Sequence, residues 1–145
     1  MHRLLVIANE TVEGDALHDA IRARAAGRGS EVLVVAPALN SRLRHWMSDE
    51  DAARRAAEER LVGCLQRLEL AGVRPYGWVG DADPLLAMED ALHVFSADEV
   101  IVATHPEERS NWLARDLVRR ARVRFRMPVF HVVVDLAAHR EYIAA

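Results

Sequence analysis

A polar turn after a short apolar run offers the first candidate for chemistry in this sequence. Val100–Ala103 is continuous and apolar, as is typical of a strand that is buried on both faces of a parallel sheet. Thr104 and His105 follow at once. Ligands bind outside the carboxyl ends of such strands, and an imidazole titrates near neutral pH, so His105 is placed for acid–base work on a small substrate. No nucleophile or orienting Asp stands at a recognisable spacing from it, which favours a binding role over catalysis.

The residues after this turn offer an anion site. Arg109, Ser110 and Asn111 stand where a helix should begin, at about Ser110 or Asn111. Either residue would cap the helix, its free N–H groups would face a ligand, and the Arg109 guanidinium would add a fork of donors. A plain cap beside a solvated arginine explains the same pattern equally well.

Acidic, histidine and cysteine side chains give weaker signals. Asp83-Pro84 is interpreted as a helix start, with Asp83 as the cap and proline in the first turn. Asp81, in the Gly80-Asp81 turn just before it, is a candidate ligand contact. The seven histidines have no metal-ligand spacing, so no metal is expected. Cys64 is the single cysteine and falls within a helical apolar pattern, which indicates packing and not a nucleophile.

Alternating strand and helix patterns position these residues. Short apolar strands are expected at 3–8, 31–36, 100–103 and 129–134, with a weaker edge strand at 73–79 that contains proline and glycine. Helices are expected at about 13–26, from a cap at Ser48 to about 71, from 84 to about 95, and from about 110 to 125. The alternation predicts an α/β fold of the Rossmann-like kind, a three-layer doubly wound five-stranded parallel sheet in the order 3-2-1-4-5. Residues 1–135 would form this domain and residues 136–145 a C-terminal tail.

Composition limits the classes of function. The 145 residues carry 28% charged side chains, a net charge of -3 and a pI of about 6.2, so nucleic acid is not an expected partner. The absence of lysine excludes Schiff-base chemistry and a phosphate-loop lysine. No apolar run approaches the ~20 residues of a membrane span, and a cytoplasmic location is expected. The segment Pro37–Met47 gathers Arg42, Arg44, His45 and Trp46, and is interpreted as a lid or a protein contact.

In its order of motifs the chain resembles the universal stress proteins, within the adenine-nucleotide α-hydrolase-like group. The resemblance rests on four points that span nearly the whole chain: the turn after the first strand, the glycine-acid turn after the third, the turn after the fourth, and the proline that opens the last. These are Ala8-Asn9-Glu10, Gly80-Asp81, Thr104-His105 and Met127-Pro128-Val129. The resemblance implies the same sheet, an adenine-nucleotide site at its carboxyl edge and a homodimer.

One departure from the family bears on the nucleotide. Nucleotide-binding members carry a G-x2-G-x9-G-[ST] segment after the fourth strand, whose glycines let backbone N–H groups approach phosphates. The corresponding segment here, His105–Asp116, has no glycine and contains Glu107 and Glu108. The first turn also offers Asn9 and Glu10 in place of the family's Asp. By resemblance the chain is similar to the branch that does not retain ATP.

Three hypotheses are consistent with these patterns. The first is a non-catalytic, homodimeric regulatory domain of the stress response with a degenerate nucleotide site and an unidentified protein partner. The second is an ATP or AMP sensor that uses a modified loop, Thr104–Asn111, and binds weakly. The third is a small-molecule enzyme that uses His105. The candidate ligand contacts are Ala8, Asn9, Glu10, Val35, Ala36, Gly80, Asp81, Thr104, His105, Arg109, Ser110 and Asn111.

The expected dimer interface is the last strand. Its sequence is almost wholly apolar, and such a strand at a sheet edge is an aggregation hazard unless it is covered. The family's answer is a dimer across this strand, with His131 at or near the interface. The candidate interface residues are Val129, Phe130, His131, Val132, Val133 and Val134.

Overall fold

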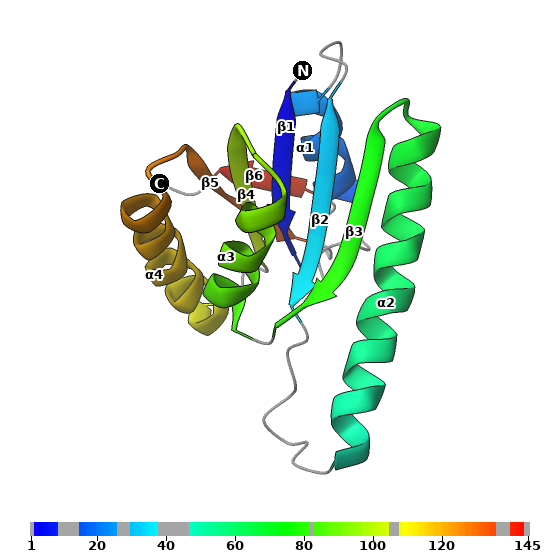
Figure 1. Ribbon diagram of the computed structural model, residues 1–145, viewed down its shortest axis with the longest axis vertical. Coiled ribbons are helices and arrows are strands. Elements are labelled where there is room, and N and C mark those ends of the chain that lie inside the picture. The colour runs from blue at the N-terminus through cyan, green and yellow to red at the C-terminus, as the bar shows by residue number, and fades with distance from the viewer. Residues whose placement is uncertain are drawn as a thin grey trace.

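A computed structural model of the chain describes residues 2–8, 15–25, 30–37, 47–81, 83–104, 108–135 and 140–143. Strands and helices alternate along the chain, as the sequence patterns predict (Figure 1). The elements are β1 (Arg3–Ile7), α1 (Asp15–Ala25), β2 (Glu31–Pro37), α2 (Met47–Leu70), β3 (Arg74–Gly80), α3 (Pro84–Val94), β4 (Glu99–Thr104), α4 (Glu108–Phe125), β5 (Val129–Asp135) and β6 (Arg140–Ile143). In this part of the chain no helix is long and apolar enough to cross a membrane.

The sheet has the order β3-β2-β1-β4-β5-β6. Its first five strands are parallel, so the predicted order 3-2-1-4-5 is confirmed. A sixth strand was not predicted. β6 lies within the stretch expected to be a tail, and it pairs antiparallel with β5, with Ile143 opposite Val132 and Arg140 opposite Asp135. Backbone groups along an apolar strand need partners, and β6 supplies them on the outer side of β5.

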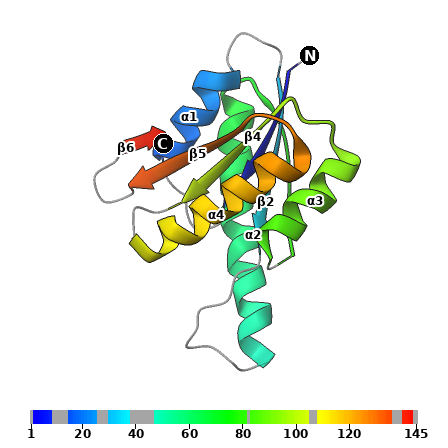
Figure 2. The same cartoon turned by 90° about the vertical axis from the view of Figure 1, so that its left-hand side faces the viewer.

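Helices cover both faces of the sheet (Figure 2). On one face, α1 and α2 pack against the even-numbered residues of β1, such as Leu4 and Val6. On the other face, α3 and α4 pack against its odd-numbered residues, such as Leu5 and Ile7. All four of these side chains are buried. The continuous apolar runs that the sequence shows in the central strands are therefore explained by burial on both sides.

Helix starts were predicted with mixed success. Asp83 caps α3 as expected, since its Oδ1 accepts a hydrogen bond of 3.0 Å from the N–H of Leu85, and Pro84 occupies the first turn. The cap expected at Ser48 is wrong, because α2 already begins at Met47. The cap expected at Ser110 or Asn111 is also wrong, because α4 begins at Glu108 and includes both residues in its first turn. A polar residue inside the first turn satisfies the same local pattern as a cap, so these sequence signals misplace a helix start by a few residues.

β3 is the sheet edge that the sequence predicts. Pro75 is tolerated there because the N–H that it lacks would point away from β2, whereas the N–H of the preceding Arg74 donates to the Ser30 carbonyl at 3.3 Å. Gly77 lets α2 approach closely, since a Cβ at this position would lie 2.9 Å from Leu65 Cδ1. The proline and the glycine thus fit the strand to an edge position under a long helix.

Candidate functional site

Three of the candidate ligand contacts, Ala8, Val35 and Ala36, come together at the carboxyl edge of the sheet, but they are buried. The N–H of Ala8 donates to the carbonyl of Val35 at 3.1 Å, so the ends of β1 and β2 lie side by side. Ala8 is 2% exposed, and Val35 and Ala36 are completely buried. In this conformation a ligand cannot reach the side chains of Val35 and Ala36. Asn9 and Glu10, which complete this group, lie outside the described residues.

The Gly80-Asp81 turn joins β3 closely to α3. A Cβ on Gly80 would lie 2.9 Å from Val35 Cγ1 and 3.0 Å from Ala87 Cβ, so glycine is required for this close approach. The Oδ1 of Asp81 accepts a hydrogen bond of 2.9 Å from the N–H of Asp83. This bond gives Asp81 a structural role in the turn, although its side chain is exposed at the sheet's carboxyl edge. Among the residues described, no three His, Cys, Asp or Glu side chains are placed to hold a metal ion.

Thr104 and the buried His131 form a pair, although the sequence patterns assign them to two different sites. The Oγ1 of Thr104 lies 2.7 Å from Nε2 of His131, within hydrogen-bond distance. His131 is 2% exposed and sits opposite Val102 in the sheet. Side chains alternate along a strand, so His131 shares with Val129 the face that α4 covers. Thr104 shares this face with Val102, and that alternation is the signal that could have predicted the pair.

The first turn of α4 lies at the carboxyl end of β4. Arg109, Ser110 and Asn111 occupy this turn, whose N–H groups have no partner within the helix. The side chains of these three residues lie outside the described part, as does His105 altogether. An anion site here, and catalysis by His105, therefore stay predictions.

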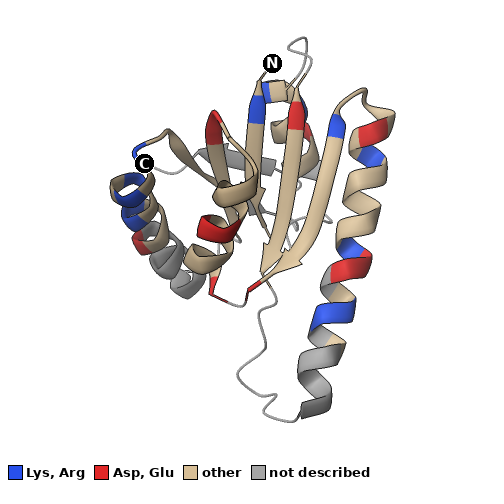
Figure 3. Cartoon of the chain, viewed as in Figure 1, with Lys and Arg blue, Asp and Glu red and all other residues tan. Residues whose placement is uncertain are grey.

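Arginines recur along the C-terminal half of α4 (Figure 3), and three of them make local contacts: Arg119, Arg122 and Arg124. The Nη2 of Arg119 donates to Oδ1 of Asp116 at 2.6 Å, and the Nη2 of Arg124 donates to Oε1 of Glu89 at 2.7 Å. Arg122 donates twice to the carbonyl of Val129, at 3.0 and 2.8 Å. This last contact ties the end of α4 to the start of β5, so Arg122 has a structural role.

The expected dimer interface does not lie at the sheet edge. β5 runs between β4 and β6, and Val129, His131, Val132 and Val133 are each 2% exposed. The premise that β5 is an edge strand is therefore wrong, because residues 140–143 pair with it. The Val134 side chain lies outside the described part, and dimerisation itself stays a prediction.

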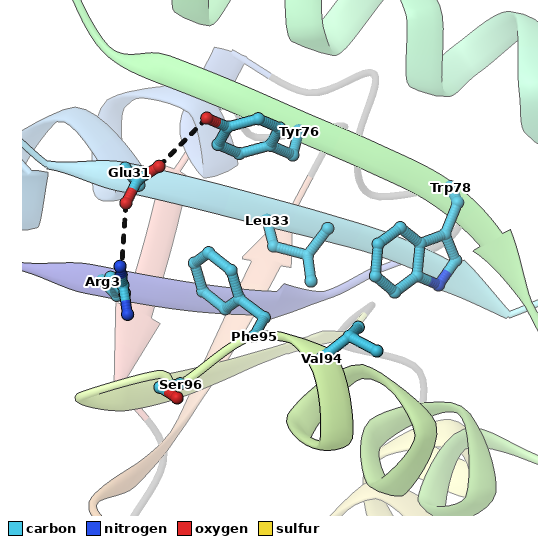
Figure 4. Close-up of a pocket in the computed structure, with 8 residues that line it drawn as sticks. All are labelled: Arg3, Glu31, Leu33, Tyr76, Trp78, Val94, Phe95 and Ser96. Atoms are coloured by element: carbon cyan, nitrogen blue, oxygen red, sulfur yellow. Dashed lines mark hydrogen bonds and ion pairs between the residues drawn. The ribbon is translucent and has the colours of Figure 1, made fainter.

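A groove at the opposite end of the sheet was missed by the sequence reasoning. It has a volume of about 410 Å³ and opens on the α3 side, near the amino ends of the strands (Figure 4). Exposed aromatic residues two positions apart on β3 are the sequence signal that could have indicated it. The residues that line it are Arg3, Glu31, Leu33, Tyr76, Trp78, Val94, Phe95 and Ser96.

One carboxylate organises the polar end of this groove. The Tyr76 hydroxyl donates to Oε2 of Glu31 at 3.0 Å, and Nε of Arg3 donates to Oε1 at 3.1 Å. These hydrogen bonds, the one from Tyr76 first, hold the pKa of Glu31 below its usual value, with a further contribution from the charge of Arg74. Glu31 is therefore ionised at neutral pH.

Comparisons with known proteins support a fold assignment. No family model and no characterised relative matches the sequence. Among solved structures, a universal stress protein from Archaeoglobus fulgidus is 18% identical, with a TM-score of 0.64 over 90% of this chain and 93% of the other. A protein of the same family from Burkholderia pseudomallei is 19% identical, with a TM-score of 0.63 over 89% of this chain and 93% of the other.

A third match comes from a plant. A universal stress protein family member from Arabidopsis thaliana, solved with AMP bound, is 11% identical, with a TM-score of 0.57 over 92% of each chain. At such identities the likeness concerns the fold, and it extends over almost the whole of each chain. This chain has the α/β fold of the universal stress proteins.

Proposed function

We propose that the chain is a cytoplasmic, non-catalytic regulatory domain of the universal stress protein type, with a degenerate nucleotide site. The fold match over about nine tenths of the chain supports the general class. The finer part of the proposal, loss of the phosphate-binding loop, rests on the segment that follows β4.

The observation that carries the proposal is the early start of α4. Only three residues separate the end of β4 at Thr104 from the start of α4 at Glu108. Beyond the first turn, backbone N–H groups donate to carbonyls of the same helix and are not available to phosphate oxygens. Within the helical part of the segment, Glu108–Asp116, only the N–H groups of the first turn are therefore available to a ligand. The family's glycine-rich segment has many more positions where the backbone can approach a phosphate.

Weak nucleotide binding is the alternative that a specific observation favours. The Arabidopsis protein of this fold was solved with AMP bound. The first turn of α4 follows the end of β4 in the chain, and its N–H groups would donate hydrogen bonds to one anionic group. An AMP or ATP sensor would then place its phosphate at Arg109–Asn111 and its base near Ala8.

We also propose that the domain forms a homodimer. Both edge strands of the described sheet, β3 and β6, carry backbone groups that no other described strand pairs with. Because β6 lies outside β5, a dimer that extends the sheet at this end would pair β6 with a second copy. Sedimentation of the purified protein over a range of concentrations would test this, and a single species with the mass of one chain would refute it.

The nucleotide that stays with the purified protein tests the main proposal. The protein is isolated without added nucleotide and denatured, and the released small molecules are separated and quantified by chromatography. We expect no stoichiometric ATP, ADP or AMP, because a site limited to one helical turn should release its ligand during purification. One equivalent of adenine nucleotide per chain would overturn the proposal and establish the sensor alternative.

A further inference from the structure

The groove beside β3 has the dimensions of a small-molecule site. Its volume of about 410 Å³ falls within the range of roughly 300–1,000 Å³ that is typical of ligand pockets. Arg3 and Glu31, at one end of it, open β1 and β2. The polar end of the groove therefore lies at the amino ends of the strands, opposite to the carboxyl edge where the nucleotide site is expected, and the groove extends along β3 to Trp78. A ligand held at this polar end does not depend on the proposed function.

Most of the groove is apolar and exposed to solvent. Leu33 is fully buried in the sheet between the two ends, and Figure 4 shows it between the rings of Phe95 and Trp78. Trp78 is 38% exposed, Tyr76 45% and Val94 75%, so several of the large apolar side chains that face water gather here. Exposed apolar residues are ordinary when they are scattered, but a cluster that lines a hollow is typical of a binding site.

The polar end of the groove has hydrogen-bond donors on Arg3 that no described residue uses. Each oxygen of the Glu31 carboxylate already accepts one bond, from Nε of Arg3 and from the Tyr76 hydroxyl. The two terminal nitrogens of the Arg3 guanidinium make no hydrogen bond within the part of the chain that the structure describes. Glu31 thus fixes the guanidinium by its Nε side and leaves the terminal fork for a ligand. Figure 4 places Arg3 between Glu31 and Ser96 at this end.

We propose that the groove binds a small molecule that combines a flat apolar ring with a single carboxylate. The carboxylate receives two parallel N–H···O bonds from the terminal nitrogens of Arg3. The ring packs against the exposed faces of Trp78 and Phe95. A doubly charged phosphate fits less well, because the ionised Glu31 stands beside Arg3, the one arginine among the described residues that line the groove. A cationic ligand fits less well because the unused donors belong to a cation.

A matched pair of probes tests both halves of this proposal. Naphthalene-2-carboxylate and its neutral analogue 2-naphthalenemethanol share one ring, and each is titrated into the full chain by calorimetry. Binding is located through the indole N–H resonance of Trp78, assigned by its loss in Trp78→Phe. We expect the carboxylate to bind about tenfold more tightly than the alcohol and to shift this resonance.

Variants then assign the contacts. Arg3→Gln should bring the affinity for the carboxylate down to that for the alcohol, and Trp78→Ala should weaken both probes. The matched controls are Arg120→Gln and Leu86→Ala, which change an exposed arginine and an exposed leucine outside the groove and should leave both affinities unchanged. Circular dichroism verifies that each variant is folded.

Three results would overturn the proposal. The first is equal affinity of the wild-type protein for the carboxylate and the alcohol. The second is binding that the groove variants do not weaken, which would place the probes elsewhere on the surface. The third is that the carboxylate does not bind, because it carries both features that the groove would recognise, the ring and the carboxylate.

Discussion

The hydroxyl of Thr104 lies 2.7 Å from Nε2 of His131, and this pair joins the end of β4 to the middle of β5 on the face that α4 covers. Thr104→Val keeps the shape of the side chain and removes the hydroxyl from the buried ring nitrogen. We expect a loss of about 1–2 kcal/mol in the free energy of unfolding, because a buried polar atom loses a partner. Urea denaturation measures it. Thr104→Ser keeps the hydroxyl and should cost less, so equal stability of Thr104→Val and wild type would contradict a stabilising role for this pair.

Gly80 is expected to be the least replaceable glycine near the carboxyl edge. The Cβ of Gly80→Ala would meet Ala87 Cβ at 3.0 Å, on a helix that cannot easily move, and we expect a loss of about 1–3 kcal/mol. In Gly77→Ala the closest atoms are the ends of Leu65 and Leu61, which can rotate away, so the loss should be smaller. Gly63→Ala is the control, since nothing lies within 4 Å and alanine favours the helix by roughly 0.5–1 kcal/mol. Thermal or urea unfolding ranks the three variants by stability. A Gly80→Ala variant that is as stable as Gly63→Ala would contradict the inference that a side chain at Gly80 collides with α3.

Cys64 should make the protein less stable at high pH. Burial raises the pKa of its thiol from 9.0 to about 11, so between these values the folded state holds a proton that the unfolded state has released. Because the unfolded state then binds fewer protons, the free energy of unfolding falls as the pH rises through this window. Denaturation curves across the window should show the decline. In Cys64→Ala the part of the slope that comes from the thiol should be absent, and an unchanged slope would contradict the assignment.

β6 should protect β5 from association. A variant that ends at Asp135 leaves the outer side of an apolar strand without its partner, and such an edge is a template for pairing with other chains. We expect concentration-dependent oligomers of increasing size in sedimentation velocity. A variant that lacks only residues 144–145 keeps β6 and should behave as the full chain does. If the two truncations sediment alike, the protective role of β6 is refuted.

The sequence predicts most of the fold because each central strand is apolar without interruption and each loop changes polarity sharply. Strand order, the edge position of β3 and the Asp83 cap follow from such local signals. β6 could not be predicted in the same way. Its four residues carry no strand period of their own, and they form a strand only because β5 presents an unpaired side to them.

The sites were harder to predict than the fold. The sequence places the candidate ligand contacts Val35 and Ala36 near the carboxyl end of a strand, but both side chains are fully buried there. Their burial depends on packing by helices that are distant in sequence. The Arg3–Glu31–Tyr76 cluster joins three strands that are far apart in sequence, and no local pattern relates them. The burial of Val35 and Ala36 and the Arg3–Glu31–Tyr76 cluster both depend on contacts between neighbouring strands. Such contacts can be predicted only when the register of the sheet is known.

The central claim is that the segment after β4 no longer holds a nucleotide, and calorimetric titration of ATP and AMP with Mg²⁺ into nucleotide-free protein tests it most directly. The account predicts dissociation constants weaker than about 100 μM, corresponding to roughly -5.5 kcal/mol, with Arg109→Ala indistinguishable from wild type. A dissociation constant tighter than this, weakened by Arg109→Ala, would contradict it and would establish that one helical turn and one arginine are enough to bind the phosphate.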